Sequence, residues 1–221
     1  MLAAAAVLIW AIFEQAGLDR AVMALAYDPA LGRFPLQHSY ALNAFGHVGL
    51  KWTMLGLWAA CALWRPLRRG AIYMAVAAIA VTLLKQASAH SCPWDLADYG
   101  GTAAWFPLLA DIPANAGPGR CLPAGHPVTG FMLFGLYLAI RPTRPALARA
   151  ALVVACVIGI AAGAVQVARG AHFPSHVLWS AWVAWVATLA ADALGRRLWA
   201  RRMDRCLNVD RPAPCGGQRN F

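Results

Sequence analysis

Residues 151–186 have the sequence ALVVACVIGIAAGAVQVARGAHFPSHVLWSAWVAWV, which is the most informative stretch of the chain. Two apolar runs, each close to the length of about 20 residues that a helix needs to cross a bilayer, flank one short polar turn. The turn holds Arg169, His172 and His176. Such side chains are costly at a membrane boundary unless they serve a function. The stretch therefore predicts a pair of membrane helices with a functional site at their connecting turn.

The rest of the chain has the same character. Of its 221 residues, 61% are hydrophobic and 13% are charged, whereas soluble domains have about 25% charged residues. We expect an all-α polytopic membrane protein, a bundle of six transmembrane helices that occupies residues 1–205. The six spans are predicted at Met1–Leu18, Ala44–Trp64, Gly70–Ser88, Pro127–Ile140, Ala150–Val167 and Pro174–Leu194. Residues 206–221 are predicted to form a disordered cytoplasmic tail.

The net charge of +10 comes largely from arginines in three segments between or after the spans. These arginines are Arg65, Arg68, Arg69, Arg141, Arg144, Arg149, Arg196, Arg197, Arg201, Arg202 and Arg205. Basic residues concentrate on the cytoplasmic side of membrane proteins, so their positions argue for orientation and against nucleic-acid binding. We expect a bacterial inner-membrane protein with both termini in the cytoplasm and with the segment from Lys85 to Cys121 in the periplasm.

The first polar group on the predicted outer side is LLKQASAHSCPWDL, residues 83–96. It ends the third span with Lys85, whose ammonium group could hold an anion there. Taken alone, a lysine at a helix end is more often an interfacial anchor. Cys92, in this group, and Cys121 both fall in the predicted outer segment, where disulfides persist, so a bridge between them is plausible.

The second group is GRCLPAGHPVTGF, residues 119–131, and the third is QVARGAHFPSHVLW, residues 166–179. In the second group, Gly125 and His126 lead directly into a predicted helix, whose first amides and positive dipole end favour phosphate. In the third group, Gln166 and Arg169 are three residues apart and share a face if the helix continues. All three groups lie on the same predicted side, which indicates one site.

The order and spacing of these residues resemble the type 2 phosphatidic acid phosphatase superfamily. Its three motifs are Lys-x6-Arg-Pro, Pro-Ser-Gly-His and Ser-Arg-x5-His-x3-Asp. The matching positions are Lys85, Pro93, Pro123, Gly125, His126 and His172. Cys92, Ala124, Val165, Gln166 and His176 stand where the family has Arg, Ser, Ser, Arg and Asp.

The resemblance implies a role for each site residue. His172 would be the nucleophile that forms a phosphohistidine, His126 the acid that protonates the leaving oxygen, and His176 the substitute for the Asp that orients the nucleophile. Lys85, Gly125, Gln166 and Arg169 would bind the phosphate. We expect no metal and no cofactor for this reaction.

The expected substrate is a lipid with a phosphate ester or anhydride: lipid A, undecaprenyl pyrophosphate, or a phosphatidyl phosphate such as phosphatidic acid. The sequence does not choose among them, and it does not predict an oligomeric state. Three alternatives remain: a lipid phosphotransferase with the same intermediate, a small anion or lipid transporter, and a zinc hydrolase. The zinc hydrolase would draw its ligands from His90, Cys92, Asp95, Cys121, His126, His172 and His176.

Overall fold

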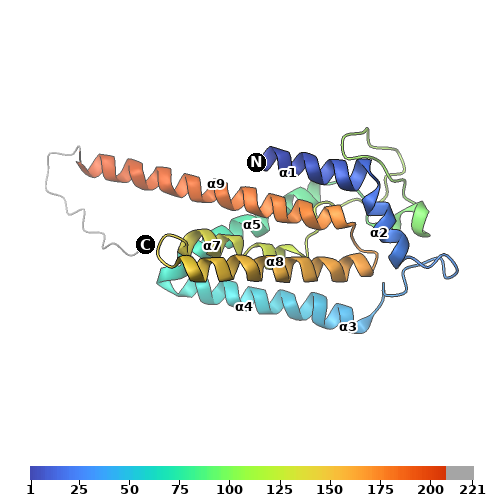
Figure 1. Cartoon of the computed structure of the whole chain (residues 1–221), viewed down its shortest axis with the longest axis horizontal. Coiled ribbons are helices and arrows are strands. Elements are labelled where there is room, and N and C mark those ends of the chain that lie inside the picture. Colours follow the sequence, from blue (N-terminus) through green and yellow to red (C-terminus); the bar gives the residue numbers. More distant parts are fainter. Residues whose placement is uncertain (208–221) are drawn as a thin grey trace.

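The computed structural model describes residues 1–207, except for the side chains of 45–47, 199 and 202–207. The predicted tail 206–221 lies outside the described residues but for its first two positions, which continue a helix. In Figure 1 most helices run side by side as an elongated bundle, and the last helix extends beyond it.

The described residues form helices and loops. The α-helices are α1 (Leu2–Ile9), α2 (Leu18–Ala26), α3 (Tyr40–Asn43), α4 (Leu50–Leu63), α5 (Arg68–Ala87), α6 (Val128–Phe131), α7 (Phe134–Ile140), α8 (Pro145–Ala168) and α9 (Pro174–Leu207). Two π-helical segments, η1 (Trp10–Gln15) and η2 (Ala44–Gly49), and three 3-10 turns, η3 (Arg65–Leu67), η4 (Pro93–Asp95) and η5 (Ala97–Tyr99), complete the elements. The prediction of an all-α chain is confirmed for the part of the chain that the structure describes.

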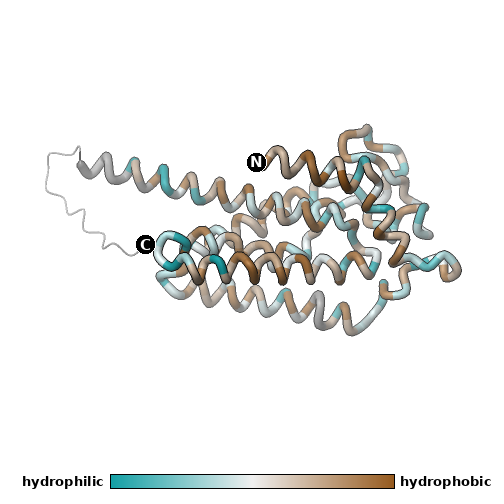
Figure 2. Tube along the Cα trace, in the orientation of Figure 1, coloured by the Kyte–Doolittle hydropathy of each residue, from teal (hydrophilic) through white to brown (hydrophobic). Residues whose placement is uncertain are grey.

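Within the described residues, three helices are long and apolar enough to cross a membrane: Arg65–Ala87, Pro145–Ala168 and Pro174–Leu198. The pair Leu2–Gln15 and Leu18–Ala26, bent by 56°, would make a fourth if it is one broken span. Two further apolar helices, Leu50–Leu63 and Val128–Ile140, are shorter. Brown, apolar residues colour much of the bundle in Figure 2, which fits a lipid-facing surface.

Each predicted span falls on a helical segment, but three of them differ in detail. The first bends at Gly17, which has a φ of +73° and starts α2 in a new direction. The fourth is interrupted between Phe131 and Phe134. The sixth continues to Leu207 because its arginine-rich end is made of good helix formers, so the end of the apolar run is not the end of the helix.

The helices of the core approach closely through glycines. A Cβ at Gly130 of α6 would lie 2.2 Å from the backbone nitrogen of Gly159 in α8, and a Cβ at Gly159 would lie 2.3 Å from the Phe131 ring. Gly135 of α7 meets the backbone of α5 at Met74 in the same way. Small residues at such crossings let membrane helices pack without a side chain between them. The backbone positions of α6 and α7 are therefore fixed by contact.

The two ends of the bundle have different characters. At one end, short turns join α4 to α5 and α7 to α8 (Figure 1). Here the buried Asp192 of α9 pairs with Arg69 of α5, at 2.8 Å, and with Arg196. At the other end, long loops gather over the termini of α5, α8 and α9 (Figure 1). The three polar groups of the sequence lie at this second end.

The loops at the second end have a small core of their own. Phe34, Tyr99 and Phe173 are buried together with Met23 and Leu96. The rings of Phe34 and Tyr99 are 5.5 Å apart, and Tyr99 contacts Phe173 edge-on at 6.4 Å. Aromatic contacts of this kind fix loops that would otherwise move. The loops are thus packed against the start of α9.

The glycine crossing gives a stability prediction. Gly130→Ala must push α6 away from the α8 backbone, so we expect it to destabilise the bundle by roughly 1–3 kcal/mol. The measurement is thermal unfolding in detergent. The matched control is Gly56→Ala in α4, where a Cβ meets nothing within 4 Å and should leave stability equal or slightly higher. Equal unfolding temperatures for the two variants would contradict the crossing.

Candidate active site

The structure brings the three polar groups of the sequence together. The Nζ atom of Lys85, in the last turn of α5, donates a hydrogen bond of 2.7 Å to the Arg120 carbonyl. The Lys85 stem packs on Gly125, where a Cβ would lie 3.1 Å from Cδ. The Ala124 amide donates to the His176 carbonyl at 3.0 Å. The segment that leads into α6 therefore touches both the end of α5 and the start of α9.

His126 stands at the entrance to α6. Its carbonyl accepts hydrogen bonds from the amide and the Oγ1 of Thr129, at 3.1 and 2.8 Å, which fixes the turn. Its side chain is 8% exposed. Ala124 is fully buried, and its carbonyl accepts from Ser180 Oγ of α9. Because α6 has only four residues, the helix dipole at its start is small. A phosphate at this place would therefore be bound more by the Gly125 backbone than by the dipole.

His172 and His176 lie on either side of the point where α9 begins. Gly170, with a φ of +73°, ends α8 and turns the chain, and α9 starts at Pro174. His172 is 6% exposed and His176 is 5% exposed. Their rings meet edge-on with centroids 5.8 Å apart. The two imidazoles are therefore neighbours within one buried site.

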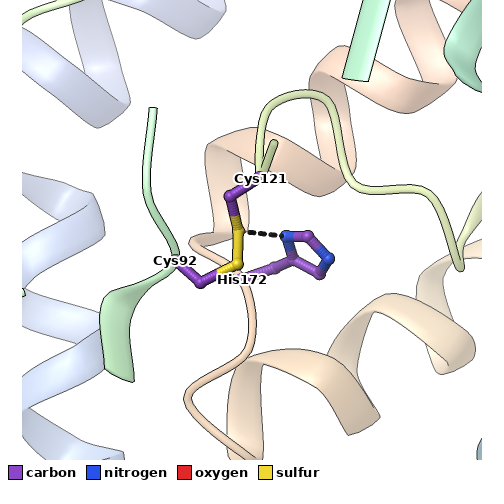
Figure 3. Close-up of side chains that lie close together, drawn as sticks. All are labelled: Cys92, Cys121 and His172. Carbon is purple, nitrogen blue, oxygen red and sulfur yellow. Dashed lines mark hydrogen bonds between the residues drawn. A yellow bond between two sulfur atoms is a disulfide. The ribbon is translucent and has the colours of Figure 1, made fainter. Parts of the chain in front are cut away.

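A disulfide joins Cys92 to Cys121, with their Cα atoms 5.2 Å apart, and it contacts the candidate nucleophile. The Sγ atom of Cys121 lies 3.1 Å from Nδ1 of His172 (Figure 3). A disulfide sulfur carries no hydrogen, so the imidazole is the donor in this contact. A neutral ring that donates from Nδ1 has its lone pair on Nε2. The contact thus favours the tautomer in which Nε2 carries the lone pair.

Cys121 also holds the second histidine. The His176 ring hydrogen-bonds the Cys121 backbone carbonyl, while its Nδ1 atom is buried with no partner among the described residues. A carbonyl can only accept, so the bond is donated by Nε2 of His176. One residue, Cys121, therefore orients both imidazoles, one through its sulfur and one through its carbonyl.

The state of the two cysteine sulfurs argues against the zinc hydrolase alternative. Cys92, Cys121 and His172 offer ligand atoms within 4.8 Å of one another. A cysteine binds zinc as a thiolate, and these two sulfurs are bonded to each other. The oxidised pair does not fit a metal ion.

The structure places Gln166 and Arg169 at the end of α8. Gln166 is 4% exposed, and its Nε2 donor has no hydrogen-bond partner in the described part of the chain. Arg169 donates from Nε and Nη2 to the Gln37 carbonyl, at 3.3 and 3.2 Å, and its Nη1 lies 3.5 Å from Gln166 Oε1. The Arg169 guanidinium thus links the turn between α8 and α9 to the loop before α3. The side-chain amide of Gln166 keeps a donor, Nε2, that no described residue uses.

One residue at this site was not identified from the sequence. The carboxylate of Asp19 in α2 accepts hydrogen bonds from the amide of Ser175, at 2.9 Å, and from its Oγ. It satisfies free donors in the first turn of α9, between the two histidines. The available signal was a lone acidic residue next to an apolar span, but nothing in the sequence connects it with a partner 156 positions away.

A partly open pocket lies beside His176. It is lined by η1, α2, the start of α9 and the loop between α5 and α6. Its side chains include His90, which stacks on Phe106 with centroids 4.3 Å apart. The candidate site therefore has an adjacent pocket, which the motif residues alone do not predict.

The comparisons with known proteins agree with this arrangement. The family model of the PAP2 superfamily matches residues 67–199, more than half of the chain and all three polar groups. Neither the curated proteins nor the solved structures gave a significant match. The chain belongs to the PAP2 superfamily, and this membership implies phosphatase or phosphoesterase activity.

Proposed function

We propose that this protein is an inner-membrane lipid phosphatase that removes phosphate from an ester or anhydride at the periplasmic face, through a phosphohistidine intermediate. The observation that carries the proposal is the meeting of Lys85, the segment before α6 and the two histidines around the start of α9 in one site. These residues come from distant parts of the sequence and match the family's motif positions. Packing alone would not require them to meet.

The proposed topology has six spans, with both termini in the cytoplasm. The short turns with Arg65, Arg68, Arg141 and Arg144 lie at one end of the bundle, which is the end that the positive-inside rule assigns to the cytoplasm. The loops and the candidate active site lie at the other end (Figure 1). A lipid in the outer leaflet would present its phosphate at that level.

In the first step, Nε2 of His172 attacks phosphorus in line with the leaving oxygen. The N–P bond forms, the P–O bond breaks, and His126 gives its proton to the leaving oxygen. The contact of Nδ1 with the Cys121 sulfur supports this assignment because a neutral imidazole that donates from Nδ1 carries its lone pair on Nε2. The lipid departs with a hydroxyl or a shorter phosphate chain.

The second step returns the enzyme to its starting state. Water attacks the phosphohistidine and loses a proton to His126, the P–N bond breaks, and inorganic phosphate leaves. Lys85, the Gly125 backbone and the Nε2 donor of Gln166 stabilise the phosphoryl oxygens in both steps. Arg169 adds long-range positive charge, because its hydrogen bonds go to Gln37 and Gln166.

His176, at the family's Asp position, has a different part in this scheme. Its ring donates to the Cys121 carbonyl, so it supports the residue whose sulfur accepts the hydrogen bond from His172 Nδ1. The orienting interaction of a carboxylate is replaced by a sulfur, which is a weaker acceptor. We assign His176 a positioning role.

The nucleophile assignment predicts that His172→Ala lowers phosphate release by about a thousandfold or more, because no other group can form the intermediate. Inorganic phosphate is measured with purified protein in detergent and a panel of lipid phosphates. His38→Ala, at an exposed histidine outside the site, is the matched control and should keep full activity. Turnover at the control rate by His172→Ala would refute the assignment.

The disulfide contact predicts sensitivity to reduction. A phosphine reductant, or Cys92→Ala, removes the bond that holds the Cys121 sulfur beside His172, so kcat should fall by about tenfold or more, with KM changing less. Cys61→Ala removes a free buried cysteine away from the disulfide and should leave activity and its sensitivity to reductant unchanged. If kcat is the same for oxidised and reduced protein, the sulfur does not orient the nucleophile.

A further inference from the structure

The pocket beside His176 contains two buried imidazole nitrogens that nothing in the described part of the chain satisfies. They are Nε2 of His90 and Nδ1 of His176, and both side chains line the pocket. Buried polar atoms in folded proteins nearly always have a partner, so an orphan atom calls for an explanation. Two orphans in the wall of one pocket indicate a common partner within it.

The charged groups in the wall are already engaged. The Glu14 carboxylate accepts from the Leu108 amide and from Trp10 Nε1, both at 2.9 Å. Asp19 is bonded to Ser175, and Arg20 lies over the Trp105 ring. Among the titratable groups in this wall, the two histidines therefore have a buried nitrogen left for a ligand.

Their tautomers determine what the ligand must offer. The His90 ring hydrogen-bonds the Pro107 carbonyl, so Nδ1 is its donor and Nε2 carries the lone pair of the neutral ring. His176 donates from Nε2 to Cys121, so its lone pair is on Nδ1. Burial lowers the pKa of His90, against the opposing effects of Glu14 and the Pro107 carbonyl, which favours the neutral ring. Both orphan atoms are acceptors, and the partner must be a donor.

A phosphate dianion does not meet this requirement, because its oxygens are acceptors as well. An ammonium group would donate, but Lys85 is close enough for its charge to act on His176, and the two cations would repel. A hydroxyl donates without charge. The walls beside the histidines are broad aromatic faces, Trp10, Trp105, Phe106 and Trp179, which suit the apolar faces of a ring.

We propose that this pocket binds an uncharged, hydroxyl-bearing headgroup, a sugar or similar polyol, through the lone pairs of His90 and His176. The inference rests on the proposed lipid phosphatase activity and narrows its substrates to lipid phosphates that carry a sugar. The rings of His176 and His172 are 5.8 Å apart, so a sugar in the pocket and a phosphate at the nucleophile belong to one molecule. The site then has an anion-binding half around Lys85 and His172 and a hydroxyl-binding half around His90.

The first test compares two substrates with the same wild-type protein: a lipid-linked sugar phosphate and phosphatidic acid. We expect kcat/KM to favour the sugar substrate by about tenfold or more, because a ligand without hydroxyls leaves both acceptors unpaired. His90→Phe keeps an aromatic ring on Phe106 and removes one acceptor, so this preference should fall about tenfold. His38→Phe, the same change at an exposed histidine, should retain the preference. No preference in the wild type, or the same preference in His90→Phe, would overturn the inference.

A binding measurement separates this inference from the proposed function. Octyl glucoside below its micelle concentration is titrated into protein in nanodiscs, with tryptophan fluorescence as the signal, since Trp10, Trp105 and Trp179 line the pocket. We expect saturable quenching that 1-octanol does not produce and that His90→Phe weakens about tenfold. Equal quenching by octanol would make the pocket an acyl-chain site and reject the sugar. Glucoside binding without phosphate release from any lipid would reject the phosphatase function and keep the ligand class.

Discussion

The position of Cys121 is the constraint on which the candidate site depends. Its disulfide to Cys92 ties the segment before α6 to the segment after α5. Its sulfur contacts His172, and its carbonyl accepts from the His176 ring. The Lys85 ammonium binds the preceding carbonyl, that of Arg120. The ends of α5, α6 and α9 are thereby held at one place, in a loop region that has little regular secondary structure.

This arrangement explains how the chain can depart from the family's motifs and keep a coherent site. Ala124 stands where the family has a serine. A hydroxyl is still present at this place, because Ser180 of α9 donates a hydrogen bond to the Ala124 carbonyl. A histidine replaces the orienting carboxylate, and the sulfur of Cys121 lies at the nucleophile's Nδ1. The Gln166 amide stands where the family has a guanidinium. Each replacement is neutral where the family has a charge or a hydroxyl, so the site depends more on fixed geometry and less on long-range charge.

The helices were predictable from the sequence because apolar runs of spanning length leave few alternatives. The bend at Gly17 and the break before Phe134 were not predicted. The bend depends on one left-handed glycine, and the break lies between the close helix contacts of Gly130 and Gly135. The candidate site was predictable as a set of residues, Lys85, His126 and His172, because of their spacing. The residues behind the site were not predictable: Asp19 and Gln37 lie between the first two predicted spans, where the sequence shows no motif. A hydrogen bond across 156 positions leaves no local pattern to find.

The bond between Asp19 and Ser175 also has a consequence for biogenesis. A chain emerges from the ribosome with its N-terminal part first, so α2 is in place long before α9. During that interval the Asp19 carboxylate has no partner beside an apolar bundle, where an unpaired charge is unfavourable. The arrival of residue 175 removes this penalty and at the same time sets His172 and His176 in position. Helices α2 and α9 thus close the site together, and the chemistry becomes available only after residue 176 has been synthesised.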